Sequence, residues 1–510
     1  MAGTAAVGQV VGGGAAGLAA WAGPRAPWLL LAVLCVAAWL VFARTPFLHD
    51  LPLMHFIAWR VGAGDTPYAD LWDMNGPATY MAHQLMLGLP LTASASVALL
   101  MTVLTGACVA CVAMIAARGG RNWLGFGIGV ALLAWIAGHG PDFLMQRDMM
   151  IAGCAVGALA LATRPGARMW RWAAAGVLIG LAVGVKPTAA PSALAAFGGA
   201  LLIDLGEGRK FRRAMWLVLG GVAGGAVWFE WLVDTGSIGA WWSIMTGYNA
   251  DYMKIARQPV GALLMEPAVL FALAAAVAGG WALRMRLRAG AGREEIAALA
   301  MAVMFAAFSA LMYVLQGKGW VYQTAPVVVM GLAAAGMAAA SLRTISRARA
   351  WAMAAAVGGV CVLAFGGVRE QLSPAYAARQ QERVTFVGEM TTALEALPAG
   401  MKVQALDTTD GALQAMLEAR RAPASPVMYD FMLFTGSDAG KAKARAAVLT
   451  AAGEADTAIL MTNQGWPDVD TGFARMREFK EFQGMLDQRY TLVSEGRRGR
   501  YGYRLFAPAG

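Results

Sequence analysis

The residues that follow the first apolar segment combine acidic, amide and imidazole groups in a short space. His49 and Asp50 stand directly after that segment, and Asp73 and Asn75 follow in a turn-rich run. A partly desolvated carboxylate at Asp50 could take the proton of a hydroxyl group. Asp73 and Asn75 could shape the loop and bind sugar hydroxyls. Asp50 could equally cap the helix predicted for HDLPLMHFIAWRV, because Asp is favoured at helix N-termini, and the two roles are compatible.

A second polar patch, HGPDFLMQRD at 139–148, lies between two further apolar segments. Asp148 and, as a second choice, Asp142 could act together with Asp50 in a catalytic site. Arg147 could bind a phosphate, because a guanidinium offers several donors in a fixed fork. Arg147 and Asp148 could also do no more than cap the helix that follows.

A third patch, QGKGWVYQ at 316–323, places a lysine between two glycines. The ammonium of Lys318 and nearby backbone N–H groups could meet a phosphate, with Tyr322 beside them. The same residue types are common at membrane borders, where lysine side chains extend to water. Lys186 is predicted inside the membrane region, where ionisable residues are usually functional, although it too could reach the border.

The first patch resembles the first outward loop of the GT-C membrane glycosyltransferases, in particular the family 39-like bacterial enzymes that use polyprenyl-phosphate sugars. The resemblance rests on the run G-x-x-P-Y-x-D-x-W-D-x-N-G-P at 64–77. The other two patches are similar to the Gln-Arg-Glu-His and Q-x-K-G-x-x-Y-H elements of such proteins. Here Asp148 replaces the Glu, and Met149 and Gln323 replace the histidines, which leaves a metal or proton-transfer role for Gln323 in doubt.

This resemblance implies a role for each patch. Asp50 is expected to be the catalytic base or a metal ligand, with Asp148 or Asp142 as its partner. Lys318 and Arg147 are expected to bind the donor phosphate. A divalent metal ion is one option for a cofactor. The remaining substrate-binding candidates are Tyr322, His49, Asp73, Asn75 and Lys186.

These residues need a membrane scaffold to hold them. The 510 residues are 58% hydrophobic and 14% charged, with a mean hydropathy of +0.54. Soluble domains have about 25% charged residues, so we predict a polytopic α-helical membrane protein with about 11 transmembrane helices of the GT-C type. The two spans that flank Lys186 could be one kinked element. The predicted spans are 27–43, 92–117, 123–138, 149–163, 173–185, 187–205, 214–233, 262–283, 296–315, 323–341 and 350–368.

Basic residues predict the orientation of the spans. Every second connection is rich in Lys and Arg, and these connections together carry 16 of them, against seven in the others. Cytoplasmic loops concentrate Lys and Arg, so we expect a cytoplasmic N-terminus and all three polar patches on the outer side. The basic connections are 118–122, 164–172, 206–213, 284–295 and 342–349.

The chain is predicted to have two parts, a transmembrane catalytic domain at 1–368 and a periplasmic α/β domain at 369–510. The second part has 17 basic and 17 acidic residues, so the net charge of +10 belongs to the membrane part and indicates no nucleic-acid partner. Strands are predicted at 401–407 and 457–465, with a hairpin around 496–499. Helices are predicted at 375–397, 409–421 and 470–486.

All five cysteines fall in predicted spans. Cys108 and Cys111 have the spacing of a redox pair, but an apolar helix lacks the accessible, electropositive setting that thiol reactivity needs. We therefore predict that they contribute to packing.

We expect an inverting glycosyltransferase of the bacterial inner membrane. It would move a sugar from a polyprenyl-phosphate donor to an extracytoplasmic glycan, lipid or protein acceptor, such as a lipopolysaccharide or polysaccharide. A transporter or lipid flippase is the alternative, although the sequence has no inverted pair of interrupted helices. An inactive relative that acts as a scaffold through 369–510 is a further alternative.

Overall fold

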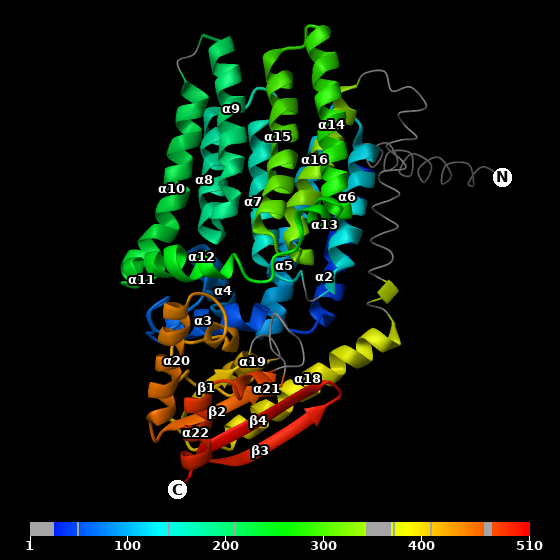
Figure 1. Ribbon diagram of the computed structural model, residues 1–510. Helices are drawn as coiled ribbons and strands as arrows, with labels where there is room; N and C mark the ends of the chain where they lie inside the picture. The colour runs from blue at the N-terminus through cyan, green and yellow to red at the C-terminus, as the bar shows by residue number, and fades with distance from the viewer. Residues whose placement is uncertain are drawn as a thin grey trace, which may run out of the picture.

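The computed structural model describes residues 25–47, 50–140, 143–208, 211–342, 369–370, 373–407, 411–463 and 472–509. Long helices run side by side in a bundle, and a small sheet lies at one end of it (Figure 1). The basic connection between α14 (Pro267–Arg288) and α15 (Arg293–Gln316) lies at the opposite end (Figure 1). Which end faces the cytoplasm stays a prediction from charge.

The bundle helices follow the predicted spans closely. Among the described residues, seven helical segments are long and apolar enough to cross a membrane, and α6 and α8 are shorter apolar helices. The predicted span at 350–368 lies outside the described residues, so the expected number of spans is not confirmed. The bundle helices are α2 (Ala26–Arg44), α5 (Ala93–Ala116), α6 (Asn122–Ala137), α7 (Arg147–Ala162), α8 (Met169–Val185), α9 (Pro191–Gly206), α10 (Arg212–Asp234), α14 (Pro267–Arg288), α15 (Arg293–Gln316) and α16 (Ala325–Ser341).

The two spans that flank Lys186 are separate helices. Lys186 has an extended backbone, with φ −161° and ψ 129°, and the short 3-10 helix η2 (Pro187–Ala189) leads into α9. Helix α8 ends here because the residue before a proline avoids the α-helical region. The break turns the side chain of Lys186 out of regular helical register, at the end of the bundle where the candidate site lies.

Glycines allow α8 and α10 to pack with their backbones in contact. A Cβ added to Gly176 would lie 2.7 Å from the backbone nitrogen of Gly221, and one added to Gly180 would lie 2.8 Å from that of Gly225. Small residues spaced four apart allow such close approach between membrane helices. This pair therefore forms a rigid wall of the bundle.

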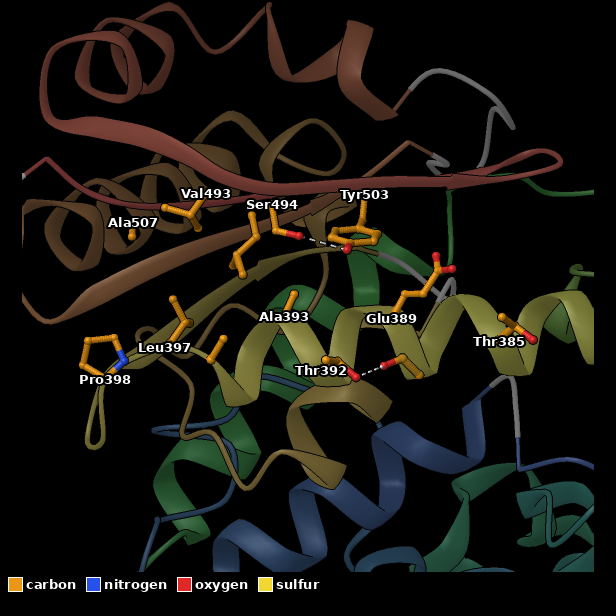
Figure 2. Close-up of a pocket in the computed structure, with 13 residues that line it drawn as sticks. Thr385, Glu389, Thr392, Ala393, Leu397, Pro398, Val493, Ser494, Tyr503 and Ala507 are labelled. Atoms are coloured by element: carbon orange, nitrogen blue, oxygen red, sulfur yellow. Dashed lines mark hydrogen bonds between the residues drawn. The ribbon is translucent and has the colours of Figure 1, made fainter.

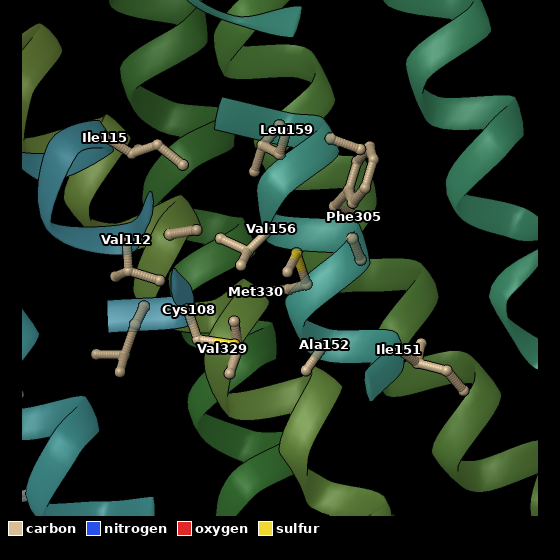
Figure 3. Close-up of a cluster of buried hydrophobic side chains, with 14 of the residues drawn as sticks. Cys108, Val112, Ile115, Ile151, Ala152, Val156, Leu159, Phe305, Val329 and Met330 are labelled. Atoms are coloured by element: carbon tan, nitrogen blue, oxygen red, sulfur yellow. The ribbon is translucent and has the colours of Figure 1, made fainter. Parts of the chain in front are cut away.

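The centre of the bundle is a core of buried apolar side chains. Cys108 and Val112 of α5 pack against Ala152 and Val156 of α7 and against Val329 of α16 (Figure 3). Cys108 is fully buried and is not in a disulfide. Its place among aliphatic side chains supports the predicted packing role.

Short helices lie between the bundle and the C-terminal sheet. Helices α3 (Asp50–Gly62) and α4 (Pro77–Leu87) come from the first polar loop. Helix α11 and helix α12 run across the end of the bundle (Figure 1). They belong to residues 238–264, which contain α11 (Ile238–Ser243), the π-helix η3 (Ile244–Tyr248), α12 (Asn249–Tyr252) and α13 (Val260–Leu264).

The described residues from Pro374 to Pro508, called the C-terminal module below, form a mixed sheet flanked by helices. The strand order is β1-β2-β4-β3, with β1 and β2 parallel and the other pairs antiparallel. The elements are α18 (Pro374–Glu395), β1 (Lys402–Leu406), α19 (Ala412–Glu418), η5 (Asp430–Leu433), α20 (Asp438–Gly453), β2 (Thr457–Thr462), α21 (Gly472–Met476), α22 (Lys480–Arg489), β3 (Tyr490–Arg498) and β4 (Tyr501–Pro508).

The predicted elements of this module are present, with two differences. Helix α20 was not among the predicted elements, because its alanine-rich run has only a narrow apolar face. The helix predicted for 470–486 is wrong as one element: α21 ends at Met476 and α22 begins at Lys480. The predicted boundary between domains at 368 lies in residues outside the described ranges and stays a prediction.

The C-terminal module docks on the short helices through backbone pairing. The backbone N–H of Trp72 donates to the carbonyl of Pro426 at 2.7 Å, and Trp72 and Val427 form an isolated parallel bridge. The N–H of Ser437 donates to the carboxylate of Asp251 at 3.0 Å. The module therefore contacts both segments that were predicted to face outward, 44–91 and 234–261.

An open groove with a volume of about 900 Å³ lies within the module itself. Its lining comes from α18, the loop that follows it, β3 and β4, and it includes Val493 and Leu397 (Figure 2). The hydroxyls of Ser494 and Tyr503 bond to each other at 3.0 Å along one wall (Figure 2). The groove is distinct from the cluster of charged residues described next.

Candidate active site

Arg147 is the centre of a cluster of polar side chains at the end of the bundle. It is the first residue of α7, after an extended Gln146. Its Nη2 donates to the carboxylate of Asp50 at 3.0 Å and to the hydroxyl of Tyr322 at 3.2 Å. Its Nη1 donates to the side-chain oxygen of Asn75. One guanidinium thus joins all three polar patches of the sequence.

Asp50 is the first residue of α3, so its charge faces the positive end of a helix as well as Arg147. Its side chain is 24% exposed, whereas that of Arg147 is 11% exposed. The two alternatives for Asp50, helix terminus and reactive carboxylate, are therefore both compatible with its position. A partly exposed carboxylate beside a largely buried cation is accessible to a substrate hydroxyl.

Asp148 forms a second ion pair next to the first. Its carboxylate, 1% exposed, accepts from Nζ of Lys186 at 3.3 Å, and Lys186 also donates to the side-chain oxygen of Gln316. A cavity of about 20 Å³, lined by Asp148, Gln316 and Gln323 among others, lies beside this pair. Such a volume holds about one water molecule.

Asp73 lies in the first loop, between α3 and α4, and is fully buried. Its carboxylate accepts from the hydroxyl of Tyr80, from Tyr429 at 2.9 Å and from the side-chain nitrogen of Asn75 at 2.6 Å. Asn75 is also buried, with 3% exposed. Both residues are buried within the loop, and Asn75 connects it to Arg147.

The first loop can lie against the end of α8 because residue 76 is a glycine. A Cβ on Gly76 would lie 2.5 Å from the carbonyl oxygen of Val185, at the end of α8. The N-G-P run therefore presses the first loop against the residue that precedes Lys186. This contact brings the first loop next to the second ion pair.

Lys318 lies beside this cluster but its ammonium points to a different segment. Nζ donates to the carbonyl of Tyr252 at 2.7 Å and to that of Ile255, and it lies 4.3 Å from the centre of the Tyr252 ring. Burial, with the nearby charge of Arg257, lowers the pKa of Lys318 to about 8. Tyr252 is near enough to Asp50 and Arg147 for their charges to act on it, so Lys318 borders the cluster through this tyrosine.

The structure thus brings seven of the ten predicted site residues together, and Lys318 borders them. Asp50, Asp73, Asn75, Arg147 and Tyr322 share one hydrogen-bonded group, and the Asp148–Lys186 ion pair lies next to it. His49 and Asp142 lie outside the described residues. Tyr429 and Tyr80 were not predicted. Tyr80 lies only three residues after Pro77, but Tyr429 is 356 positions from its partner Asp73, a separation for which sequence spacing offers no signal.

No metal-binding cluster is found in the described ranges, where no three His, Cys, Asp or Glu side chains come together. Asp50 and Asp148 each already bind a cationic side chain. The described residues therefore do not fit a divalent metal ion.

The structure is similar to the crystal structure of ArnT from Cupriavidus metallidurans bound to undecaprenyl phosphate. The TM-score is 0.61 at 14% sequence identity, and the match covers 94% of this chain and 97% of that one. The apo state of the same protein matches with a TM-score of 0.58, 14% identity and the same coverage.

A second solved structure has a related architecture. The Archaeoglobus fulgidus oligosaccharyltransferase, tethered to an acceptor peptide that contains the NVT sequon, matches with a TM-score of 0.50 and 11% identity. That match covers 94% of this chain and 74% of the other. The chain has the GT-C fold.

No protein-family model and no curated protein matches the sequence. The GT-C likeness is therefore one of fold, carried by the bundle and the C-terminal module together. It agrees with the expectation drawn from the three sequence patches.

Proposed function

We propose that the protein is a membrane glycosyltransferase that moves a sugar from a polyprenyl-phosphate donor to an extracytoplasmic acceptor. The observation that carries the proposal is the guanidinium of Arg147, shared between Asp50, Tyr322 and Asn75 in a GT-C fold. ArnT, which has this fold, is known bound to undecaprenyl phosphate. A largely buried arginine beside a partly exposed carboxylate suits a phosphate leaving group and a base.

In the proposed reaction, the acceptor hydroxyl oxygen attacks the anomeric carbon while Asp50 accepts its proton. The bond between the anomeric carbon and the phosphate oxygen breaks, and the electron pair leaves with the polyprenyl phosphate. Arg147 stabilises that phosphate, because a guanidinium binds phosphate with two parallel hydrogen bonds. Attack opposite the leaving group inverts the anomeric centre.

The remaining predicted residues have supporting roles in this proposal. Lys186 and Asp148 form the neighbouring ion pair, and Lys186 could shift toward the phosphate when donor is bound. Lys318 borders the cluster and adds positive charge. Asp148 is the partner of Asp50 in orienting the acceptor. We further propose that the protein lies in the bacterial inner membrane with the C-terminal module in the periplasm.

Mass spectrometry of surface glycans from cells with and without the gene tests the activity. Loss of one sugar in the deletion strain, restored by the wild-type gene and not by Asp50→Asn, is the expected result. Unchanged glycans in the deletion strain would count against transfer. Movement of an intact lipid by the purified protein in vesicles would favour the flippase alternative.

A further inference from the structure

Asp73 is a buried carboxylate whose charge is stabilised by hydrogen bonds. In the described part of the chain, no cationic side chain forms a salt bridge with it. Four donors reach it instead: the hydroxyls of Tyr80 and Tyr429 and the side-chain and backbone nitrogens of Asn75. A buried charge without such bonds would be strongly unfavourable.

The groups around Asp73 can act only as hydrogen-bond donors to it. Burial, together with the charge of Asp73, raises the pKa of Tyr80 and of Tyr429 well above its ordinary value. Both phenols therefore stay protonated and can donate. Asn75 must then present its NH₂ to Asp73 and its carbonyl oxygen to Arg147, because an amide has one group of each kind.

The contacts form a continuous chain of hydrogen bonds. It runs from Tyr429 to Asp73, from Asp73 to Asn75 and from Asn75 to Arg147, which binds Asp50. The hydroxyl of Tyr68 donates to the backbone carbonyl of Asn75 at 2.8 Å and fixes that residue from the other side. The links from Tyr429 to Asp73 and from Asp73 to Asn75 are buried, and the two bonds made by Arg147 are partly buried.

Tyr429, the first residue in this series of hydrogen bonds, belongs to the C-terminal module. The segment that carries Tyr429 is held by the backbone pairing of Trp72 with Pro426 and Val427. Docking of the module therefore brings the Tyr429 hydroxyl to Asp73, in the same loop as Trp72. The ring of Tyr429 also packs against Phe431, with 5.0 Å between centroids.

We propose that Tyr429, Asp73 and Asn75 are positioning residues that transmit docking of the C-terminal module to Arg147. The orientation of Arg147 toward Asp50 then depends on the module, which does more than cover the site. The use of this Arg147 orientation to bind a donor phosphate rests on the proposed function.

The hydrogen bonds from Tyr429 through Asp73 and Asn75 to Arg147 are called the relay below. Amide hydrogen exchange on the full-length protein in detergent tests this relay without any ligand. Tyr429→Phe removes one hydroxyl and should speed exchange in the first turn of α7 about tenfold. The matched control is Tyr490→Phe, because the Tyr490 hydroxyl also makes one buried bond, to the carbonyl of Ala452 at 2.8 Å, but within the module. Tyr490→Phe should leave amide exchange in α7 unchanged.

A double-mutant cycle tests whether the residues act in series. Asn75→Leu breaks the relay at its centre and should speed exchange in α7 at least as much as Tyr429→Phe. Adding Tyr429→Phe to Asn75→Leu should then have no further effect on α7. Unchanged exchange in Tyr429→Phe, an equal effect in Tyr490→Phe, or additive effects in the double variant would overturn the relay.

Binding of undecaprenyl phosphate, measured on the same proteins, connects the relay to function. Tyr429→Phe should weaken binding about 10- to 100-fold, the range expected when a bond to a charged group is lost. Binding within twofold of wild type, despite faster exchange, would separate the relay from the phosphate site. Absence of binding by the wild type would overturn the proposed function and leave the exchange result as the test of the relay.

Discussion

At the scale of single residues, the main question is what Asp50 does. Its carboxylate bonds to Arg147 at 3.0 Å and begins α3. Asp50→Asn keeps an oxygen for Arg147 and for the helix end but cannot accept a proton. We expect sugar transfer to fall about 10²- to 10⁴-fold, the usual contribution of a general base, with little change in thermal unfolding.

The control for Asp50→Asn is Asp65→Asn. Asp65 lies in the same loop but pairs with Arg60 at 2.7 Å. Transfer by Asp65→Asn should stay near the wild-type rate. If Asp50→Asn retains substantial activity in this comparison, Asp50 is a helix-terminal residue and the base lies elsewhere.

Lys318 gives a prediction about pH. Its pKa of about 8 means that the ammonium loses its charge as the pH rises from about 7 to about 9. If that charge attracts the donor, binding of undecaprenyl phosphate should weaken over this interval in the wild type. Lys318→Arg stays charged and should bind with little dependence on pH, and Lys318→Ala should bind weakly throughout.

The opposite pattern assigns Lys318 a different role. If the alanine and arginine variants both bind like wild type at every pH, the lysine serves only to hold the carbonyls of Tyr252 and Ile255. The side chain would then anchor α12 without contributing to donor recognition.

At the scale of elements, the position of the first loop depends on Gly76. A Cβ there would collide with the backbone at the end of α8, so Gly76→Ala must displace the loop or the helix. Such overpacking costs about 1–3 kcal/mol. We expect a lower melting temperature and weaker binding of undecaprenyl phosphate, because Asp73 and Asn75 move with the loop.

Gly62→Ala is the matched control for this substitution. Gly62 ends α3, and an added Cβ meets nothing within 4 Å. Its melting temperature and binding should equal those of the wild type. Wild-type binding by Gly76→Ala would show that the loop tolerates displacement and that its contact with α8 is dispensable.

At the scale of the whole molecule, the basic connections predict which side of the membrane holds the site. A reporter fused after Arg369 should be active outside the cytoplasm, and one fused within 284–295 should be active inside. The two fusions lie on opposite sides of the bundle in this topology. The reverse result would put the Arg147 cluster in the cytoplasm and exclude an extracytoplasmic acceptor.

The sequence determined the parts of this protein that depend on local patterns. Runs of apolar residues predicted the bundle helices, because each must match the thickness of a bilayer. Alternating residues and glycines predicted β1, β2 and the β3–β4 hairpin. The three polar patches identified Asp50, Arg147, Asp148 and Tyr322 as candidate site residues. Polar and charged groups beside apolar segments are costly, so they are usually functional.

Only the tertiary structure decided which of these groups bind one another. Arg147 lies 97 positions from Asp50 and 175 from Tyr322, and Tyr429 reaches Asp73 from the other end of the chain. Such pairs depend on how helices pack and how the module docks, and neither is encoded in residue spacing. The same packing directed Lys318 toward backbone carbonyls, which its place between two glycines could not reveal.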